Sequence, residues 1–199
     1  MSSIGRLRSL LRELNPPDEL QEGYRAGIVR LLDQAGSAAL DRDHWYPGHI
    51  TAGGVILSPN ADAVLLVFHP RLGRWVQPGG HVEKGDADVE SAARREVAEE
   101  VGLIDLEPLG IAGLSIHLIP ARADEPQHAH FDVRFGYRLI EGLPRRGEGI
   151  EDMRWVGVHE LSGWPTDASV RQAVATARLG LGSGSGTAPG TGEPLRRGG

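Results

Sequence analysis

Three glutamates lie within residues 89–101, a stretch whose apolar residues recur with the period of a helix. A helix places residues three and four apart on one face, so Glu96, Glu99 and Glu100 become near neighbours. Like charges at this spacing repel each other, and partial removal from water increases the cost. A divalent cation that prefers oxygen ligands, Mg²⁺ or Mn²⁺, would remove the repulsion and clamp a pyrophosphate. The alternative is a solvated acidic helix face.

Other residues around these glutamates favour the metal site. Gly79 and Gly80 precede the helix, and glycine permits a tight turn that exposes backbone carbonyls to a ligand. Arg95 stands beside the glutamates and can hold one carboxylate in its rotamer, as metal sites require of outer residues. The sequence therefore predicts a Gly-rich turn and a metal-binding helix.

A second polar set alternates along the run HAHFD. His128, His130 and Asp132 would share one face of a strand, with apolar residues on the other face. Two histidines at this spacing can reach one metal ion, and all three side chains can contact a substrate. A solvated or hydrogen-bonded polar strand face is the alternative.

Two loops supply further candidates for substrate binding. Arg71 and Arg74 precede the Gly-rich turn and can grip a terminal phosphate through paired hydrogen bonds, or they are ordinary surface charges. Glu148 and Glu151 lie in a loop before a short strand at Trp155. These two carboxylates contact substrate or simply solvate the loop.

Apolar periodicity and breakers predict the elements that position these residues. Helices are expected over 4–14, 19–34 and 167–179, and the glutamate helix runs from an N-cap at Asp86 or Asp88 to a C-cap at Gly102. Strands are expected over 50–58, 63–69, 75–77, 109–119, 129–140 and 153–156. This order predicts an α+β fold with a mixed sheet between helices. The chain divides into an N-terminal helical extension (1–47), a sheet domain (48–180) and a flexible Gly/Ser-rich tail (181–199).

Composition excludes several classes of function. The 199 residues contain no cysteine, which removes disulfides, thiolate zinc sites and cysteine nucleophiles. The net charge of −6 argues against duplex nucleic acid as a partner. Neither a signal peptide nor an apolar run of membrane-spanning length is present, so we expect no membrane association and a cytoplasmic location. The N-terminal helices would pack on the domain or on a partner chain, which leaves a homodimer open.

The stretch from Gly80 through Asp86 to the run REVAEEVGL (95–103) resembles the signature of the Nudix hydrolases. This family hydrolyses nucleoside diphosphates linked to another moiety, and the resemblance covers roughly residues 48–180. Asp86 stands where the family usually has glutamate, and one extra residue separates it from Arg95. Both departures fall in the loop, so they affect loop geometry more than metal binding.

The resemblance implies an α/β/α sandwich and an Mg²⁺- or Mn²⁺-dependent enzyme. The metal would be held by the Gly80 carbonyl, Glu96, Glu99 and Glu100. A water would attack one phosphorus of a pyrophosphate, with Glu99, Glu96 and Arg95 as catalytic residues. The general base in this family is a signature glutamate or one from a later loop, so Glu148 and Glu151 are alternatives.

The sequence thus predicts a metal-dependent pyrophosphohydrolase whose partner is a small-molecule nucleotide or nucleoside diphosphate derivative. The alternative is a Nudix-like sensor that binds nucleotide without turnover, although a pure binder has no need for a costly carboxylate cluster. Resemblance to the isomerases that share this fold would imply a catalytic cysteine. This chain has none, so an isomerase is excluded. The substrate stays open among nucleoside triphosphates, oxidised nucleotides, ADP-ribose and dinucleotides.

Overall fold

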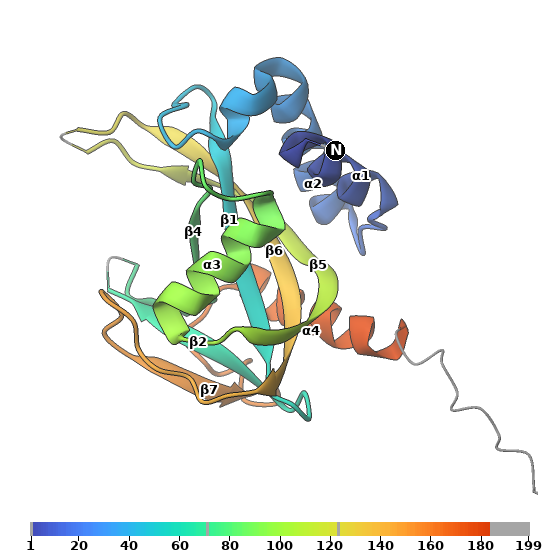
Figure 1. The fold of residues 1–199 in the computed structure, drawn as a ribbon, viewed down its shortest axis with the longest axis vertical. Helices are drawn as coiled ribbons and strands as arrows, with labels where there is room; N and C mark the ends of the chain where they lie inside the picture. Colours follow the sequence, from blue (N-terminus) through green and yellow to red (C-terminus); the bar gives the residue numbers. More distant parts are fainter. Residues whose placement is uncertain (1, 71, 123, 184–199) are drawn as a thin grey trace, which may run out of the picture.

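The computed structural model describes residues 2–70, 72–122 and 124–183 (Figure 1). The helical elements of this part of the chain are α1 (Ser3–Glu13), α2 (Glu19–Ala35), the short 3-10 helix η1 (Gly36–Leu40), α3 (Val89–Val101) and α4 (Ala168–Ser183). Its strands are β1 (Gly48–Leu57), β2 (Ala63–His69), β3 (Arg74–Val76), β4 (Gly79–His81), β5 (Asp105–Ile119), β6 (His128–Glu141) and β7 (Met153–Gly157).

The strands form one mixed sheet in the order β3-β2-β1-β6-β5, with β4 paired to β1 and β7 paired to β2. The central strands β1 and β6 run parallel, and the other pairs are antiparallel. Because β6 occupies one edge of β1, the strands β2 and β4 must share the other edge. β4 pairs with Thr51–Gly53, whereas β2 pairs with Ile56 and Leu57. The sheet is therefore split on this side, and β4 diverges from β2.

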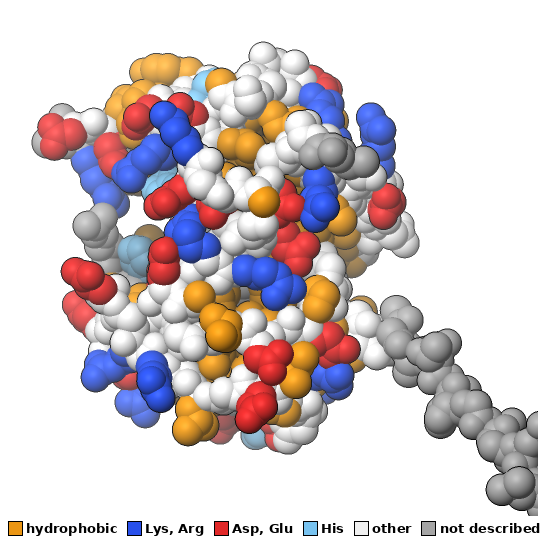
Figure 2. All heavy atoms as spheres, in the orientation of Figure 1, with side chains coloured by type: hydrophobic (Ala, Val, Ile, Leu, Met, Phe, Trp, Pro, Cys, Tyr) orange, Lys and Arg blue, Asp and Glu red, His pale blue; other side chains and the backbone are white. Residues whose placement is uncertain are grey.

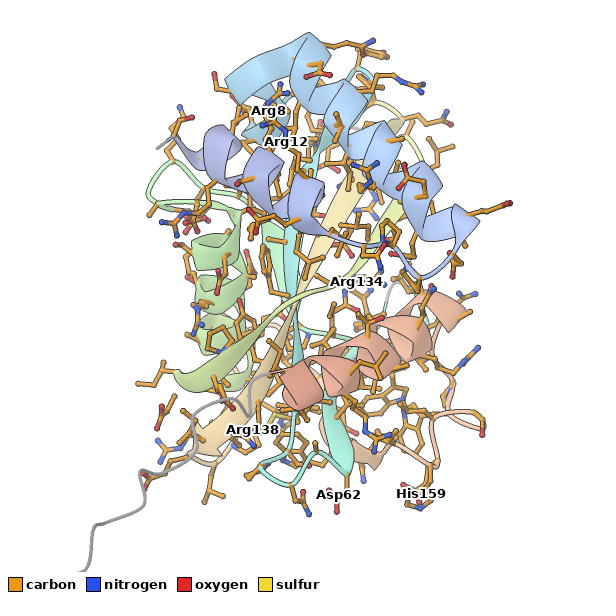
Figure 3. The ribbon with its side chains drawn as sticks, turned by 90° about the vertical axis from the view of Figure 1, so that its right-hand side faces the viewer. Arg8, Arg12, Asp62, Arg134, Arg138 and His159 are labelled. Atoms are coloured by element: carbon orange, nitrogen blue, oxygen red, sulfur yellow. The ribbon has the colours of Figure 1, made fainter. Side chains whose placement is uncertain are left out.

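Helices cover both faces of the sheet. One core cluster joins α1, α2 and α3 to the sheet, through buried residues such as Leu11, Leu32 and Val97. A second cluster joins α4 to the opposite face, through residues such as Val170 and Val174. In Figure 3, α3 lies on one side of the strands and α4 on the other, with the α1–α2 pair across the top of the view. The expected α/β/α sandwich of the α+β class is thus confirmed.

Most expected elements form close to their expected bounds, with two corrections. Gly79 and Gly80 form the strand β4 rather than a turn, because their backbone pairs with Ala52 and Gly53 of β1. The helix α4 continues to Ser183, so the expected tail at 181–199 begins too early. Leu181 packs against the second core cluster, which explains the longer helix. The rest of that tail, residues 184–199, lies outside the described residues.

A membrane span requires a long and strongly apolar helix. None of the helices within the described ranges meets that requirement.

Candidate metal and nucleotide site

A cleft of about 1450 Å³ opens between α3, β4 and the β5–β6 pair. Glu96 and Glu100 of α3 line one part of it, and Gly80 and His81 of β4 lie beside them. The polar face of β6 forms another part of the wall. The cleft therefore brings together segments that are far apart in the sequence, from Ser3 of α1 to Val170 of α4.

The helix α3 is fixed at both ends, which sets the direction of its glutamates. Asp88 is the N-cap and accepts a hydrogen bond from the Ser91 backbone N–H at 2.8 Å. Gly102 ends the helix in the left-handed conformation, with φ of 69°. Val97 and its apolar neighbours are buried against the sheet. Glu96 is four residues from the buried Ala92, so it shares the inward side of the helix and lines the cleft. Glu100 does the same three residues after Val97, whereas Glu99 points outward and is exposed.

Arg95 organises the carboxylates of this face. Its guanidinium donates to both carboxylate oxygens of Asp86 at 3.1 Å, to Glu96 at 2.9 Å and to Glu99 at 3.0 Å. It also donates to the backbone carbonyl of His81 at 2.8 Å. These carboxylates hold the pKa of Arg95 above its ordinary value, chiefly through the hydrogen bonds to Asp86. Asp86 thus pairs with the arginine despite its shorter side chain and the extra loop residue.

The remaining glutamates are crowded and partly dehydrated. Burial, followed by the negative charge of Glu96, raises the pKa of Glu100 to about 7. The pKa of Glu96 is also raised by burial, against the opposing hydrogen bond from Arg95. Glu99 differs, because 60% of its side chain is exposed. Such strain between carboxylates is what a bound cation would relieve.

The backbone of Gly80 approaches this cluster so closely that a side chain would collide with it. A Cβ atom at Gly80 would lie 2.6 Å from an oxygen of the Glu96 carboxylate. Glycine is needed here for space rather than for an unusual turn. The donor set of carboxylates and a nearby backbone carbonyl fits a hard divalent cation such as Mg²⁺ or Mn²⁺.

The polar residues of β6 face the cleft, as their alternation predicts. His128, His130, Asp132 and Arg134 all line it, whereas Phe131 lies in the core on the other face. Asp132 accepts from Arg134 Nε at 2.7 Å and from the Thr51 hydroxyl at 3.1 Å.

Arg134 was not expected from the sequence, although it continues the same alternation. It is only 5% exposed and donates to the Ser115 hydroxyl at 3.0 Å through Nη2. Its Nη1 has no hydrogen-bond partner among the residues that the structure describes. Figure 3 labels Arg134 beside the sheet, well away from the surface arginines Arg8 and Arg138. The cleft wall thus holds a buried cationic donor with hydrogen-bonding capacity to spare.

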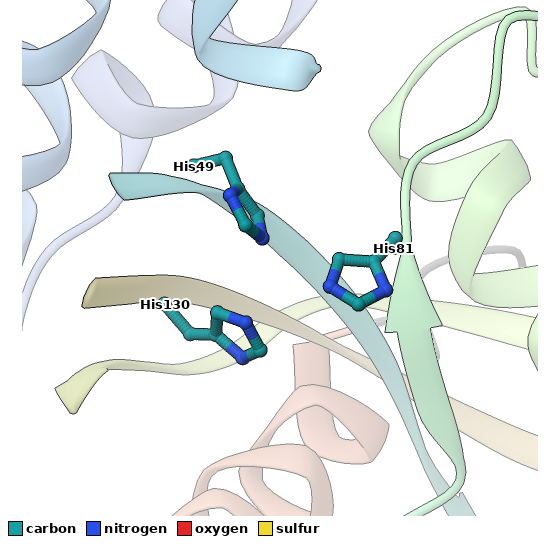
Figure 4. Close-up of side chains that lie close together, drawn as sticks. All are labelled: His49, His81 and His130. Carbon is teal, nitrogen blue, oxygen red and sulfur yellow. The ribbon is translucent and has the colours of Figure 1, made fainter. Parts of the chain in front are cut away.

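Two histidines that sequence reasoning missed join His130. His49 of β1 stands opposite His130 in the parallel register, and His81 of β4 stands opposite Thr51 of β1. Figure 4 shows the three imidazole rings turned toward one another from three strands. Burial is the main cause that lowers the pKa of His49 to about 4 and that of His130 to about 2. No local spacing could have found this cluster, because the strand register creates it.

The other candidate residues lie at the margin. Arg71 lies outside the described residues. Arg74 of β3 forms an ion pair with Asp167 near the start of α4. Glu148 and Glu151 are exposed, in a loop whose backbone caps the end of α3 through Gly147 N–H to the Glu100 carbonyl at 2.8 Å. The structure therefore brings this loop to the glutamate helix without burying its carboxylates.

Comparison with known proteins agrees with the fold. The NUDIX domain model matches residues 47–179, which is more than half of the chain, so the protein belongs to the Nudix family.

Among curated relatives, the RNA pyrophosphohydrolase of Caulobacter vibrioides is 36% identical over 102 residues. That match covers 41% of this chain and 58% of the relative, so the chain spans little more than half of that protein's length.

Solved Nudix structures share the fold at low sequence identity. An Ap4A hydrolase of C. elegans has a TM-score of 0.53 and 18% identity, with 67% of this chain and 98% of that chain covered. The NUDIX domain of Shewanella oneidensis NrtR, complexed with ADP ribose, has a TM-score of 0.50 and 21% identity over 66% and 87% of the two chains.

Proposed function

We propose that this Nudix protein is a metal-dependent pyrophosphohydrolase that cleaves a nucleoside diphosphate-linked small molecule. The observation that carries the proposal is that Glu96 and Glu99 accept hydrogen bonds from Arg95, while Glu96 and Glu100 line a large cleft. Its relative in Caulobacter vibrioides is described as an RNA pyrophosphohydrolase, which supports the same type of reaction.

Glu96, Glu99, Glu100 and the carbonyl of Gly80 would hold Mg²⁺ or Mn²⁺. When bound, the cation would polarise the phosphoryl oxygens and offset the charge that develops on the leaving phosphate. The acidic face has the oxygen donors for this role, and Arg95 keeps two of its carboxylates oriented.

The protein residues divide the remaining work between binding and proton transfer. The Nη1 of Arg134, which has no partner among the described residues, and the polar face of β6 offer donors to phosphate oxygens in the same cleft. Glu99, the most exposed of the three glutamates, would accept the proton of an attacking water, with Glu96 as the second candidate. The water oxygen forms a bond to one phosphorus, the bridging P–O bond breaks, and the leaving phosphate departs.

The distribution of charge over the surface supports a small substrate. Lys and Arg side chains are interspersed with Asp and Glu over the face drawn in Figure 2, rather than gathered into one broad basic area. Duplex nucleic acid requires a basic footprint, so the cleft is better suited to a nucleotide derivative.

A hydrolysis screen tests the proposal. The full chain would be incubated with Mg²⁺ or Mn²⁺ and with nucleoside triphosphates, ADP-ribose, NADH or dinucleoside polyphosphates, and the products would be resolved by chromatography. We expect EDTA-sensitive cleavage of one class, and the products will identify the phosphorus that is attacked.

The nucleotide-sensor alternative gives a different result. A sensor would show metal-dependent thermal stabilisation by one nucleotide without cleavage of any compound in the screen. That outcome would refute the hydrolase proposal.

A further inference from the structure

The histidine cluster of the cleft has a geometry that the hydrolase reaction does not use. The ring centroids of His49 and His130 are 4.9 Å apart, those of His49 and His81 are 5.0 Å apart, and those of His81 and His130 are 5.2 Å apart. The three rings therefore form a nearly equilateral triangle, and they come from three different strands (Figure 4).

The ring nitrogens are close to the spacing that one metal ion needs. One nitrogen from each of the three rings lies within 4.8 Å of the other two. Nitrogens bound to a tetrahedral zinc at about 2.0–2.1 Å stand about 3.3 Å apart. Small rotations of the three side chains would therefore bring them to bonding distance, since their strands already hold them on one side of the sheet.

His49 supplies an independent indication of a missing ligand. The residue is 0% exposed, and its Nε2 has no hydrogen-bond partner within the described part of the chain. An unpaired polar atom in the interior costs about 1–3 kcal/mol, so such atoms call for an explanation. Coordination of a cation would satisfy this nitrogen.

Neighbouring groups orient two of the rings in the way that metal-binding histidines require. His49 Nδ1 lies 3.4 Å from the His44 carbonyl, and a carbonyl only accepts. The hydrogen of the neutral ring is thus favoured on Nδ1, which leaves the lone pair on the unpartnered Nε2. His128 plays a supporting part, because its Nδ1 donates to the Pro126 carbonyl at 2.8 Å while its Nε2 lies 3.2 Å from His130 Nε2. Such outer contacts fix the rings of ligating histidines.

We propose that His49, His81 and His130 bind one transition-metal ion of the Zn²⁺ class, at a site distinct from the glutamate face. Imidazole nitrogens suit zinc, cobalt and nickel, whereas carboxylates and carbonyls suit magnesium and manganese. Three protein ligands leave one coordination position for water or an anionic oxygen, and His81 and His130 line the cleft that would supply it. The inference goes beyond the proposed hydrolase and does not depend on it.

Metal titration of the full chain tests this site. Chelator-treated protein would be titrated with Co²⁺ in excess Mg²⁺, which keeps the glutamate face occupied, and the visible absorption of tetrahedral Co²⁺ would be followed. Competition by Zn²⁺ would then be measured. We expect one Co²⁺ per chain, displaced by Zn²⁺.

Matched variants assign the ligands. His81→Gln and His130→Gln should each weaken binding by at least about 100-fold, because loss of a ligand costs more than loss of an outer contact. His117→Gln serves as the near control, since this ring touches His130 without belonging to the triad, and Glu96→Gln serves as the control for the acidic face. Neither control should change Co²⁺ affinity more than about threefold.

The proposal fails if the wild-type chain binds no Co²⁺ under these conditions. It also fails if His81→Gln and His130→Gln bind normally, or if Glu96→Gln abolishes binding. Thermal unfolding of the metal-free variants shows whether they fold. Should either histidine variant not fold, X-ray absorption of the Zn²⁺-loaded wild type decides instead, with three imidazole ligands expected and one or none contradicting the site.

Discussion

The glutamate face and the histidine cluster border the same cleft but differ in charge and in burial. The glutamates stand on one turn of α3, and Arg95 compensates part of their charge with hydrogen bonds to Glu96 and Glu99. The histidines come from three strands, and burial is the first cause that lowers their pKa values. One group is charged and partly wet, and the other is neutral and largely enclosed.

The two groups of side chains suit different cations. Carboxylates attract hard ions that keep their water, whereas neutral imidazoles prefer ions that accept nitrogen ligands. The residues are also brought together differently. The glutamates are neighbours within one turn of a helix, whereas the histidines meet through the register of three strands. Changes at the glutamate face should therefore alter hydrolysis, and changes at the histidines should alter transition-metal binding.

The largest expected effect is on hydrolysis by the glutamate face. Glu99→Gln or Glu100→Gln should lower the rate at least about 100-fold, because each removes a ligand or a base. The fold should persist, with unfolding free energy changed by less than about 1 kcal/mol for the exposed Glu99. Steady-state kinetics and urea unfolding measure both quantities.

Glu90→Gln is the matched control, since Glu90 lies in the first turn of the same helix and pairs with Arg94. A near-normal rate in both Glu99→Gln and Glu100→Gln would refute the site assignment.

A smaller effect is expected from the arginine that joins the loop to the helix. Arg95→Lys keeps the charge but cannot reproduce the paired hydrogen bonds to Asp86, whose side chain is only 6% exposed. We expect a loss of about 1–3 kcal/mol in unfolding free energy, as for other buried groups left partly unpaired. Urea denaturation measures this loss, and Arg94→Lys on the same helix is the comparison variant. Equal stability of the two variants would show that Arg95 does not fix the loop.

A third effect concerns pH in the metal-free protein. Because burial raises the pKa of Glu100 from 4.5 to about 7, the folded state keeps a proton that the unfolded state has already released between those pH values. Stability from this group is therefore lost as pH rises from about 5 to about 7. The melting temperature of Glu100→Gln should rise relative to that of the wild type across this range.

Mg²⁺ should raise the melting temperature of the wild type but not that of the variant, since the cation replaces the proton in offsetting the negative charge. If the melting temperatures of wild type and variant, measured without Mg²⁺, changed equally with pH from about 5 to about 7, the raised pKa of Glu100 would be contradicted.

The smallest effect is expected in the loop that caps α3. Glu148 and Glu151 are exposed, so Glu148→Gln and Glu151→Gln should change the hydrolysis rate less than about twofold. Kinetic measurement of each variant tests whether the base lies on the helix. A loss of more than about 100-fold in either variant would move the general base from Glu99 to the loop.

The sequence predicts those parts of the site that depend on residues close together in the chain. Asp88, Gly102 and the spacing of the glutamates depend only on helix geometry and capping, and they lie where expected. The strand alternation likewise placed His130 and Asp132 on one face, and it extends to Arg134.

The rest could not be predicted, because it depends on pairing between distant segments. Gly79, Gly80 and His81 form a three-residue strand only because the edge of β1 is available for pairing. His49 reaches His130 through the parallel register of β1 and β6, which no periodicity within either strand specifies. Strand order and register would have had to be known first.

The N-terminal helices carry a consequence for how the protein can be divided. Leu7, Leu11 and Ile28 are buried in the same core cluster as Val97 of the glutamate helix, and Arg6 pairs with its N-cap Asp88 at 2.9 Å. A chain cut at residue 48 would leave that apolar surface open to water and would free the start of α3. We therefore expect the unit that folds to include residues 3–40 as well as the 47–179 that the family model matches, so an excised or fused version should keep both to preserve the cleft.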